Sequence, residues 1–458
     1  MGTDQFGYET TVSSPAAAAA WDNTVLAFLA HGARTPEYLG RTLSEEPDFA
    51  MGHATKGLFL LMLGRRELTA TAQDSYAMAL AAADRVAPTA REMGYVRALG
   101  AWLDGRPSGT VQEMEAILAC WPEDALAMKM SHATRFILGD GKGMRASVEA
   151  LLPAYDAKNP ACGYLLGCHA FCLEETGEYG RAETAGRLGL SLAPDDAWGL
   201  HAVAHVFDMT ANARAGLNWL EGREGAWAHC NNFRYHVWWH KALMHLDQGE
   251  IDAVFHLYDT EVRRDHTDDF RDISNGAAML MRLELEGIDV GDRWEEMAEI
   301  SERRTEDACL IFADLHYLMA LVGGQRDVAI KRMMGRLHRD AKQSSVSEMT
   351  ARMANPGLSA ATGLEAFGAG DYKTAFLNLG RARRSMQLVG GSHAQRDVFE
   401  RLTIDSAIRG GFLHEAESIL RERTTQRSGR LDAYASSRLD LIADSQGDWK
   451  EVGRLPAE

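Results

Sequence analysis

The sequence predicts an all-α protein, a solenoid of helix hairpins wound into a right-handed superhelix and curled around an inner pocket. A unit recurs in which an apolar helix, a turn glycine, a small residue five positions later and a second helix follow one another. Three of the turn glycines, Gly105, Gly141 and Gly177, are 36 residues apart. Proline is scarce, with 11 residues, and no run alternates valine and threonine as strands do. We therefore expect helix in more than two thirds of the chain, and no sheet of three or more strands.

The clearest repeat lies between Tyr164 and Asp195. Its apolar, glycine and proline positions have the spacing of a tetratricopeptide repeat, a helix pair of about 34 residues, and they are Leu173, Gly177, Tyr179, Ala182, Leu190 and Pro194. One such pair cannot bury its own apolar face, so neighbouring pairs must stack into a continuous core.

The domain prediction is an N-terminal extension over residues 1–20 and a single helical-repeat superhelix over residues 21–458. The repeat is regular to about residue 260 and less regular afterwards, and no Gly/Ser-rich or Pro-rich linker divides it. Pro15 is expected near the start of an early helix. No basic and then apolar leader and no run of 18 apolar residues are present, and the six cysteines form no C-x-x-C pair. These features predict a cytoplasmic protein with reduced thiols and no membrane partner.

The charge balance excludes one class of partner. Lys and Arg number 48 and Asp and Glu number 65, which gives a net charge of −17. Such a chain repels phosphates, and no basic stripe compensates, so we expect no nucleic-acid partner. The expected ligand is a small molecule, and the methionine-rich and tryptophan-rich faces also suit a homodimer.

Histidines form two matched pairs. His201 and His205 lie in WGLHAVAHVFDM, and His236 and His240 lie in YHVWWHKALMH. Each pair has i,i+4 spacing, so both imidazoles share one helix face. The pairs are 35 residues apart, about one repeat, and one repeat earlier the same positions fall near Tyr164 and Cys168. Because first helices of adjacent repeats lie side by side, the four imidazoles are expected to converge in one cavity.

Three roles for these four histidines remain open. They have a spacing that can bind zinc or another divalent metal, although no carboxylate lies between them. Without a metal they can serve as an acid/base or ligand-orienting group, because imidazole titrates near neutral pH. They can also be structural, making hydrogen bonds between helices. No cofactor is favoured, and a metal-independent site is slightly preferred to a metal-dependent one.

The segment before the second pair adds further candidates. Asn231 and Asn232 precede the helix in AHCNNFRYHVWWH, where either can cap it, and Asn232 is also assigned to substrate binding. Cys230 is a weaker candidate for a thiolate nucleophile. Trp239 and its aromatic neighbours either wall a pocket or belong to the core.

A second candidate site lies in LVGGSHAQRDVFERL. Ser392 and Gln395 form a capping-box pattern, which predicts a helix beginning at about His393. The helix start attracts anions, and His393, Arg396 and Asp397 add polar groups to its first turn. A weaker pair, Asp314 and His316, occurs in FADLHYLMA, and Asp272 is weaker still.

Four runs together carry a family resemblance: DDAWGLHAVAHVFDM, NNFRYHVWWHKALMHLDQGE, FADLHYLMA and GGSHAQRDVF. They resemble the tetratricopeptide repeat protein 38-like family over nearly the whole chain. The resemblance implies an all-helical repeat fold and carries no settled activity. The positions that match its motifs are His201, His205, His236, His240, His316, Ser392, His393, Gln395, Arg396 and Asp397.

The function predicted from these residues is small-molecule binding with acid/base chemistry, and hydrolysis is the first reaction class expected. His205, His240, His393 and Asp397 are the expected catalytic residues. The expected substrate-binding residues are His201, His236, Asn232, Trp239, His316, Ser392, Gln395 and Arg396. Arg396 would hold an anionic group, and Asp397 or Asp314 would fix a histidine tautomer. The alternative is a non-catalytic adaptor that binds a peptide in an open concave groove.

Overall fold

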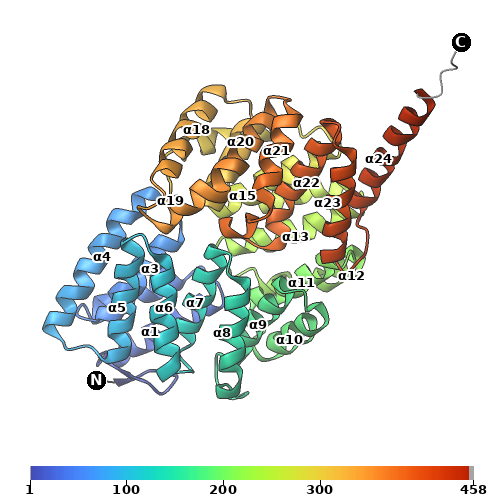
Figure 1. Ribbon diagram of the computed structural model, residues 1–458. Helices are drawn as coiled ribbons and strands as arrows, with labels where there is room; N and C mark the ends of the chain where they lie inside the picture. The colour runs from blue at the N-terminus through green and yellow to red at the C-terminus, as the bar shows by residue number, and fades with distance from the viewer. Residues whose placement is uncertain (1, 453–458) are drawn as a thin grey trace, which may run out of the picture.

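The computed structural model describes residues 2–452 and confirms the all-helical, solenoid-like fold (Figure 1). Helices make up 75% of the chain. In the described residues, the one β-sheet has two strands, in which Gly2 pairs with Thr10 and Thr3 with Glu9. None of the described helices has an apolar stretch long enough to cross a bilayer.

The elements follow one another as a series of helices joined by short turns. The first group comprises β1 (Gly2–Thr3), β2 (Glu9–Thr10), α1 (Pro15–Leu29), α2 (Thr35–Glu45), α3 (Ala50–Met62), α4 (Arg66–Arg85), α5 (Ala90–Leu103), α6 (Pro107–Cys120), α7 (Ala125–Leu138), α8 (Gly141–Leu151) and η1 (Leu152–Ala154). The second comprises α9 (Cys162–Glu175), α10 (Tyr179–Leu192), α11 (Ala197–Met209), α12 (Ala213–Leu220), η2 (Glu224–Ala226), α13 (Phe233–Asp247), α14 (Ile251–Leu257) and η3 (Tyr258–Val262). The third comprises α15 (Phe270–Leu285), α16 (Arg293–Arg303), α17 (Ile311–Gly323), α18 (Asp327–Lys342), α19 (Glu348–Arg352), η4 (Met353–Gly357), α20 (Leu358–Gly368), α21 (Tyr372–Arg383), η5 (Met386–Val389), α22 (His393–Arg409), α23 (Leu413–Gln426) and α24 (Ala433–Val452).

Successive helices pack as hairpins, and each first helix also packs against the first helix of the next hairpin. Helices α7, α9, α11, α13 and α15 follow one another in this way, as do α15 and α17. This is the nearest-neighbour packing of a helical solenoid. Helix α1 begins at Pro15, with Ser14 as its N-cap, so it crosses the expected boundary at residue 20.

Turn residues in left-handed conformation separate many of the hairpins. Gly105 (φ 77°) and Gly177 (φ 83°) adopt this conformation, as the repeat predicts. At two turns the sequence pattern is off by one or two residues. Gly139 takes the left-handed conformation instead of Gly141, and Gln325 takes it instead of Gly324. The spacing therefore identifies the turns correctly but not always the residue that makes them.

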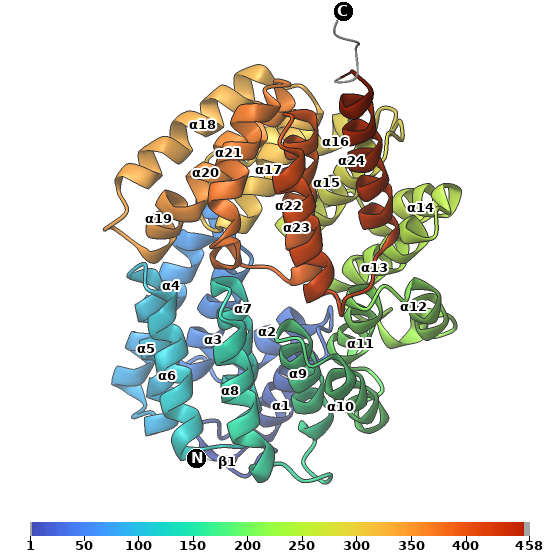
Figure 2. The same cartoon turned by 45° about the vertical axis from the view of Figure 1, so that its right-hand side comes forward.

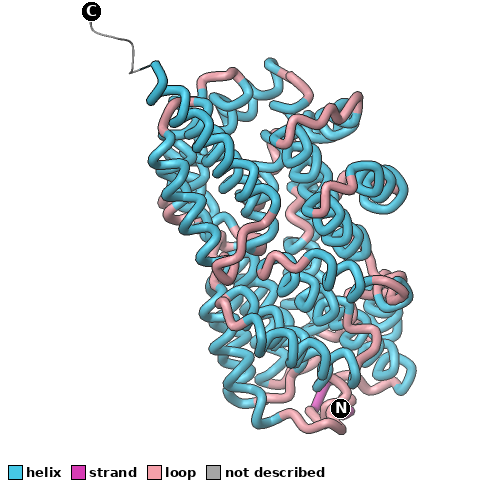
Figure 3. Tube along the Cα trace, turned by 90° about the vertical axis from the view of Figure 1, so that its right-hand side faces the viewer, coloured by secondary structure: helices cyan, strands magenta, loops and turns pink. Residues whose placement is uncertain are grey.

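The chain curls so that its C-terminal helices return to the N-terminal ones. Figure 2 shows α18–α23 above α1–α8, with α9–α14 joining the two tiers along one side, and Figure 3 shows the tiers from that side. Helix α22 packs against both α15 and α11. The Arg352 guanidinium donates to the carbonyls of Leu138 and Leu388, at 2.7 Å each, and so ties α7 to the C-terminal tier. Arg427 and Asp208 form an ion pair at 2.8 Å that also links the C-terminal helices to α11.

The N-terminal hairpin, α1 and α2, contacts the loop before α13 and so closes another side of the solenoid. The loop between α1 and α2 pairs with the loop before α13: the amide of Ala33 donates to His229 O at 3.1 Å, and that of Asn231 donates to His31 O at 2.8 Å. These two loops are about 200 residues apart in the sequence. The solenoid is thus held as a closed ring by hydrogen bonds between distant segments.

Helix α13 lies where the two large apolar cores meet. Val237 and Met244 belong to the core of the N-terminal half, and Trp239 and Leu243 belong to the core of the C-terminal half. Polar residues of α13 are therefore held deep inside the molecule by packing on both sides.

Candidate functional site

The ring of helices encloses a central cavity of about 420 Å³. This volume lies in the range of small-molecule sites, which are about 300–1,000 Å³. The apolar part of the wall draws on both tiers and includes Phe28, Phe59, Met62, Phe136, Phe270, Leu310, Phe312 and Leu388. A largely apolar body therefore fits this space.

Polar side chains line the same cavity. They are His31, Lys129, His132, His201, Asn231, Asn232, His236, Asp269, Arg271, Ser392 and Gln395. They come from positions between residue 31 and residue 395, so only the closed ring brings them together. The cavity thus combines an apolar wall with a small set of convergent polar groups, which is the usual composition of a ligand site.

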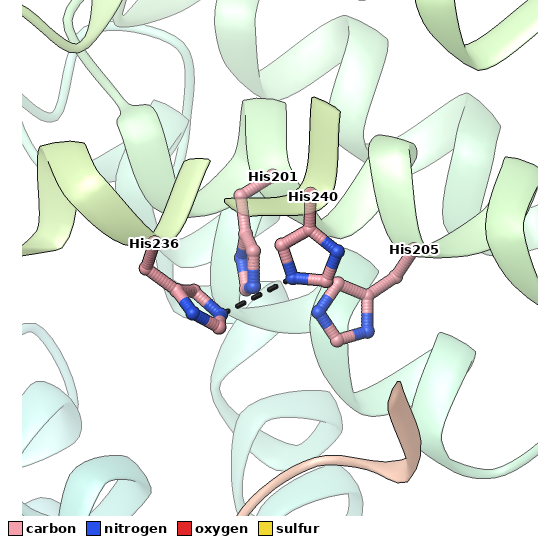
Figure 4. Close-up of side chains that lie close together, drawn as sticks. All are labelled: His201, His205, His236 and His240. Atoms are coloured by element: carbon pink, nitrogen blue, oxygen red, sulfur yellow. Dashed lines mark hydrogen bonds between the residues drawn. The ribbon is translucent and has the colours of Figure 1, made fainter. Parts of the chain in front are cut away.

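His201, His205, His236 and His240, the four-histidine cluster, lie close together (Figure 4), and two of them, His201 and His236, line the cavity. His201 and His205 come from α11, and His236 and His240 from α13. One ring nitrogen of each lies within 4.8 Å of those of the other three. The Nε2 atoms of His236 and His240 are 3.2 Å apart, within hydrogen-bond distance. The convergence expected from the 35-residue spacing is therefore present.

Three rings of the four-histidine cluster have their Nδ1 atoms oriented by a neighbouring oxygen. The Nδ1 of His201 is 3.2 Å from its own helix's carbonyl at Trp198, and that of His236 is 2.9 Å from Asn275 Oδ1. The Nδ1 of His205 is 3.3 Å from a carboxylate oxygen of Glu174. Each ring can donate its Nδ1–H outward, which leaves the Nε2 lone pair facing the other imidazoles.

The cluster is buried, and burial controls its protonation. Burial lowers the pKa of His201 and His240 well below 6.5, and it lowers the pKa of His236 to about 3. Burial also opposes the charge on His205, but the Glu174 carboxylate outweighs it and raises the pKa of this imidazole. The cluster therefore holds one protonatable histidine beside three neutral ones.

The two members of each histidine pair lie at different depths. His201 and His236 line the cavity, whereas His205 and His240 lie behind them, both with no exposed surface. The sequence analysis expects His205 and His240 to be catalytic and His201 and His236 to bind substrate. The geometry favours the opposite arrangement, because contact with a ligand requires the cavity wall. Trp239 stacks on the His236 ring at 5.3 Å and supports it from behind.

Lys129 is a cavity residue that the sequence analysis does not identify. It is 3% exposed, its ammonium lies 4.8 Å above the Trp198 ring, and the nearest polar partner recorded is Cys168 Sγ at 3.8 Å. Among the described residues it has no carboxylate at ion-pair distance. A buried cation that forms no direct ion pair at a cavity wall is suited to an anionic ligand. Extending the histidine register one further repeat back, from Cys168 to about residue 132, would have indicated this part of α7.

His31 is a second such residue. It follows α1 with a left-handed backbone (φ 56°), and its ring stacks on Phe233 at 4.5 Å and on Trp198 at 5.4 Å. Burial lowers its pKa well below 6.5. It has no repeat-related equivalent, so no sequence pattern points to it.

The GGSHAQRD turn is divided between two cavities. Ser392 and Gln395 form the predicted capping box at the start of α22 and line the central cavity. His393 and Arg396 face a second cavity of about 370 Å³, and both lie 3.3 Å from a carboxylate oxygen of Glu175. Of this turn, the capping residues therefore reach the central cavity and the charged residues do not.

Asp397 belongs to a buried arginine network. Its carboxylate accepts from Arg423 at 2.7 Å and from Arg401 at 2.8 Å. Burial alone would raise its pKa, but these guanidinium groups hold it well below 3.8. Asp397 lies outside the lining of the central cavity, so the structure gives it no contact with a ligand there.

Asp314 and His316 also lie away from the cavity lining. Asp314 is bonded to the Arg336 guanidinium at 2.6 Å, so it orients no histidine. The Nδ1 of His316 donates to Phe312 O at 2.7 Å, and burial lowers its pKa to about 4. Their helix, α17, is buried on all sides. Asp314 is satisfied by Arg336, whereas the Nε2 of His316 is buried with no hydrogen-bond partner among the described residues.

The residues before α13 take structural roles. The side chain of Asn231 accepts from the amide of Phe233 and caps the helix, while Asn232 lines the cavity and donates to Asp272 at 2.6 Å. Burial raises the pKa of Asp272 to about 7. Burial also raises the pKa of the Cys230 thiol to about 12, which opposes a thiolate nucleophile.

The sequence matches no protein-family model.

Proposed function

We propose that this protein binds a small molecule with an apolar body and one anionic or carbonyl group in the central cavity, and that it acts on this molecule by acid/base chemistry. The observation that carries the proposal is the combination of Lys129 with an apolar wall in one cavity of about 420 Å³. Lys129 is a buried cation that forms no direct ion pair among the described residues, and the Asp196 carboxylate interacts with it only at longer range. Lys129 would bind the anionic end, and the phenylalanines would cover the apolar body.

His201 is best placed to act on the ligand. It lines the cavity, its Nδ1 is held by the Trp198 carbonyl, and its Nε2 is buried with no partner among the described residues. A neutral imidazole in this state accepts a proton from water, which supports hydrolysis as the reaction class. His236 is less available, because its Nε2 is engaged by His240.

The site supports a small molecule over a peptide. An extended peptide requires a continuous groove along the solenoid, whereas here α1–α3 and α22 both contribute to the wall. The ion pairs and backbone hydrogen bonds that close the ring would have to open to admit a longer chain. The adaptor function is therefore the less favoured proposal.

Octanoate tests ligand binding, because it combines one carboxylate with an apolar chain. We expect a single site by calorimetry, and Lys129→Met should weaken binding about 30-fold by removing a buried charge-assisted hydrogen bond. Ala133→Phe places a ring in the cavity and should abolish binding, whereas Ala77→Phe on the exposed face of α4 should leave it unchanged. Binding that is equal in all three variants would overturn the proposed site.

Hydrolysis is tested with p-nitrophenyl octanoate. We expect turnover by the wild-type protein, and His201→Gln should lower it at least 100-fold, the usual contribution of a general base. Thermal unfolding of the variant verifies the fold. If octanoate binds but the ester is not cleaved above the Ala133→Phe background, the binding function stands and hydrolysis is wrong.

A further inference from the structure

The four-histidine cluster has more hydrogen-bond capacity than its surroundings satisfy. Among the described residues, Nε2 of His201, both ring nitrogens of His205 and Nδ1 of His240 are buried without a hydrogen-bond partner. Buried polar atoms are normally paired, and each unpaired one costs about 1–3 kcal/mol. Two of these atoms, the Nε2 atoms of His201 and His205, would face a common ion, and they indicate a missing partner that accepts lone pairs.

Glu174 gives a second and independent indication. Its side chain has no exposed surface, and neither carboxylate oxygen has a hydrogen-bond donor among the described residues. The Glu175 carboxylate lies within 4.8 Å of it, and the one basic group at ion-pair distance among the described residues is His205, at 3.3 Å. A buried carboxylate needs a compensating positive charge nearby, and the four-histidine cluster is the polar group that it faces.

From these observations we propose that the four-histidine cluster binds one divalent transition-metal ion of the zinc class. Each ring would use its Nε2. The nitrogens of a tetrahedral zinc site are roughly 3.3 Å apart, given Zn–N bonds of about 2.0–2.1 Å. The His236–His240 separation of 3.2 Å already matches one edge of such a tetrahedron, and the other nitrogens, within 4.8 Å, need to move inward by about 1 Å or less.

The neighbours of the cluster have the arrangement of a metal site's outer layer. Metal-binding histidines usually donate their second N–H to a carboxylate, an amide or a backbone carbonyl, which fixes the tautomer and the ring direction. Glu174, Asn275 and the Trp198 carbonyl occupy these positions for His205, His236 and His201. A cluster with only a structural role would not need three rings oriented toward a common point.

This inference rests on the proposed function and deepens it by naming a cofactor for the same site: in the metal-bound protein the His201 Nε2 is a ligand, and the ion replaces it as the group that activates water. His201 and His236 line the cavity, so the ion would lie directly behind its wall. Zinc expands to five ligands, and a water reaching it from the cavity would be activated for hydrolysis. The metal site itself is defined by its nitrogens, and its test requires no substrate.

The test is titration of EDTA-treated protein with Co²⁺ and with Zn²⁺. We expect one Co²⁺ per chain with the intense visible absorption of tetrahedral cobalt, and displacement of that ion by Zn²⁺. His236→Gln should weaken Zn²⁺ binding at least 100-fold, and Asn275→Leu about tenfold. The matched control is His245→Gln, on the same helix but paired with Glu250 on the surface side, which should bind as the wild type does.

X-ray absorption spectroscopy at the zinc edge tests the site in the wild-type protein, so it remains decisive if a variant fails to fold. The wild-type zinc complex should show four nitrogen neighbours at about 2.0–2.1 Å. Absence of the cobalt band, or equal Zn²⁺ affinity in His236→Gln and His245→Gln, would overturn the metal site. Because octanoate binding depends on Lys129, the proposed ligand site is confirmed or refuted separately.

Discussion

Between pH 6.5 and pH 4 three buried histidines will together lower the free energy of unfolding by about 4 kcal/mol for each pH unit that the pH falls. Outside the four-histidine cluster, three further imidazoles are held neutral by burial: His31, His132 and His316. Each has a pKa lowered from 6.5 in the folded protein. In the unfolded chain each imidazole takes up a proton near pH 6.5.

The sign of this pH dependence follows from the number of protons that the folded and unfolded states bind. Below pH 6.5 the unfolded state binds more protons than the folded state, until the pH reaches the folded pKa, which is about 4 for His316. The contribution of these histidines to the free energy of unfolding is therefore constant above this window and falls as the pH falls through it. Each histidine contributes about 1.4 kcal/mol per pH unit, and the three together give the expected slope.

Urea unfolding at pH 7, 6 and 5 in the presence of EDTA measures this slope. His316→Leu removes one of the three groups and should reduce the slope by about 1.4 kcal/mol per pH unit. His414→Leu, on the exposed face of α23, is the matched control and should leave it unchanged. If both variants retain the wild-type slope, the neutral state of the buried His316 is wrong.

Replacing Arg423 by Met will destabilise the protein by about 3–5 kcal/mol. Arg423 is 3% exposed and donates to Asp397 at 2.7 Å and to Asp432 at 2.6 Å. Its loss leaves two buried carboxylates with less positive charge to compensate them. Denaturant midpoints of the wild type and the variant, measured at pH 7, give this difference.

The control lies two residues earlier on the same helix. Arg421 pairs with Glu417 at 2.6 Å but is largely exposed, so Arg421→Met should cost less than about 1 kcal/mol. Equal destabilisation by the two substitutions would contradict the structural role assigned to the network. It would also reopen a ligand-binding role for Asp397, the residue that the sequence analysis places among the catalytic groups.

The helical repeat was predictable because periodicity is local information. The 36-residue glycine spacing and the 35-residue histidine spacing both arise from one hairpin stacking on the next, and the structure confirms the all-helical fold and the convergence of the four-histidine cluster. The capping box at Ser392 is likewise a pattern of neighbouring residues, and α22 begins where it predicts.

Which residues reach the cavity wall could not be predicted in the same way. Whether His201 or His205 reaches the wall depends on how tightly the ring closes, which is decided by contacts such as Arg352 with Leu138, about 200 residues apart. His31 enters the cavity through the same closure. Asp397 appeared as a polar group on an accessible helix start. Arg401 lies one turn later on the same helix, but Arg423 comes from α23, whose packing against α22 the sequence does not indicate.

The most direct test of the proposed cavity is a crystal structure of the protein with 8-bromooctanoate, with the bromine located by its anomalous scattering. The account predicts one bromine inside the central cavity, among Phe59, Phe136 and Phe312, and a carboxylate within hydrogen-bond distance of Lys129 Nζ. Bromine found only on the outer surface, or a carboxylate bound away from Lys129, would contradict it.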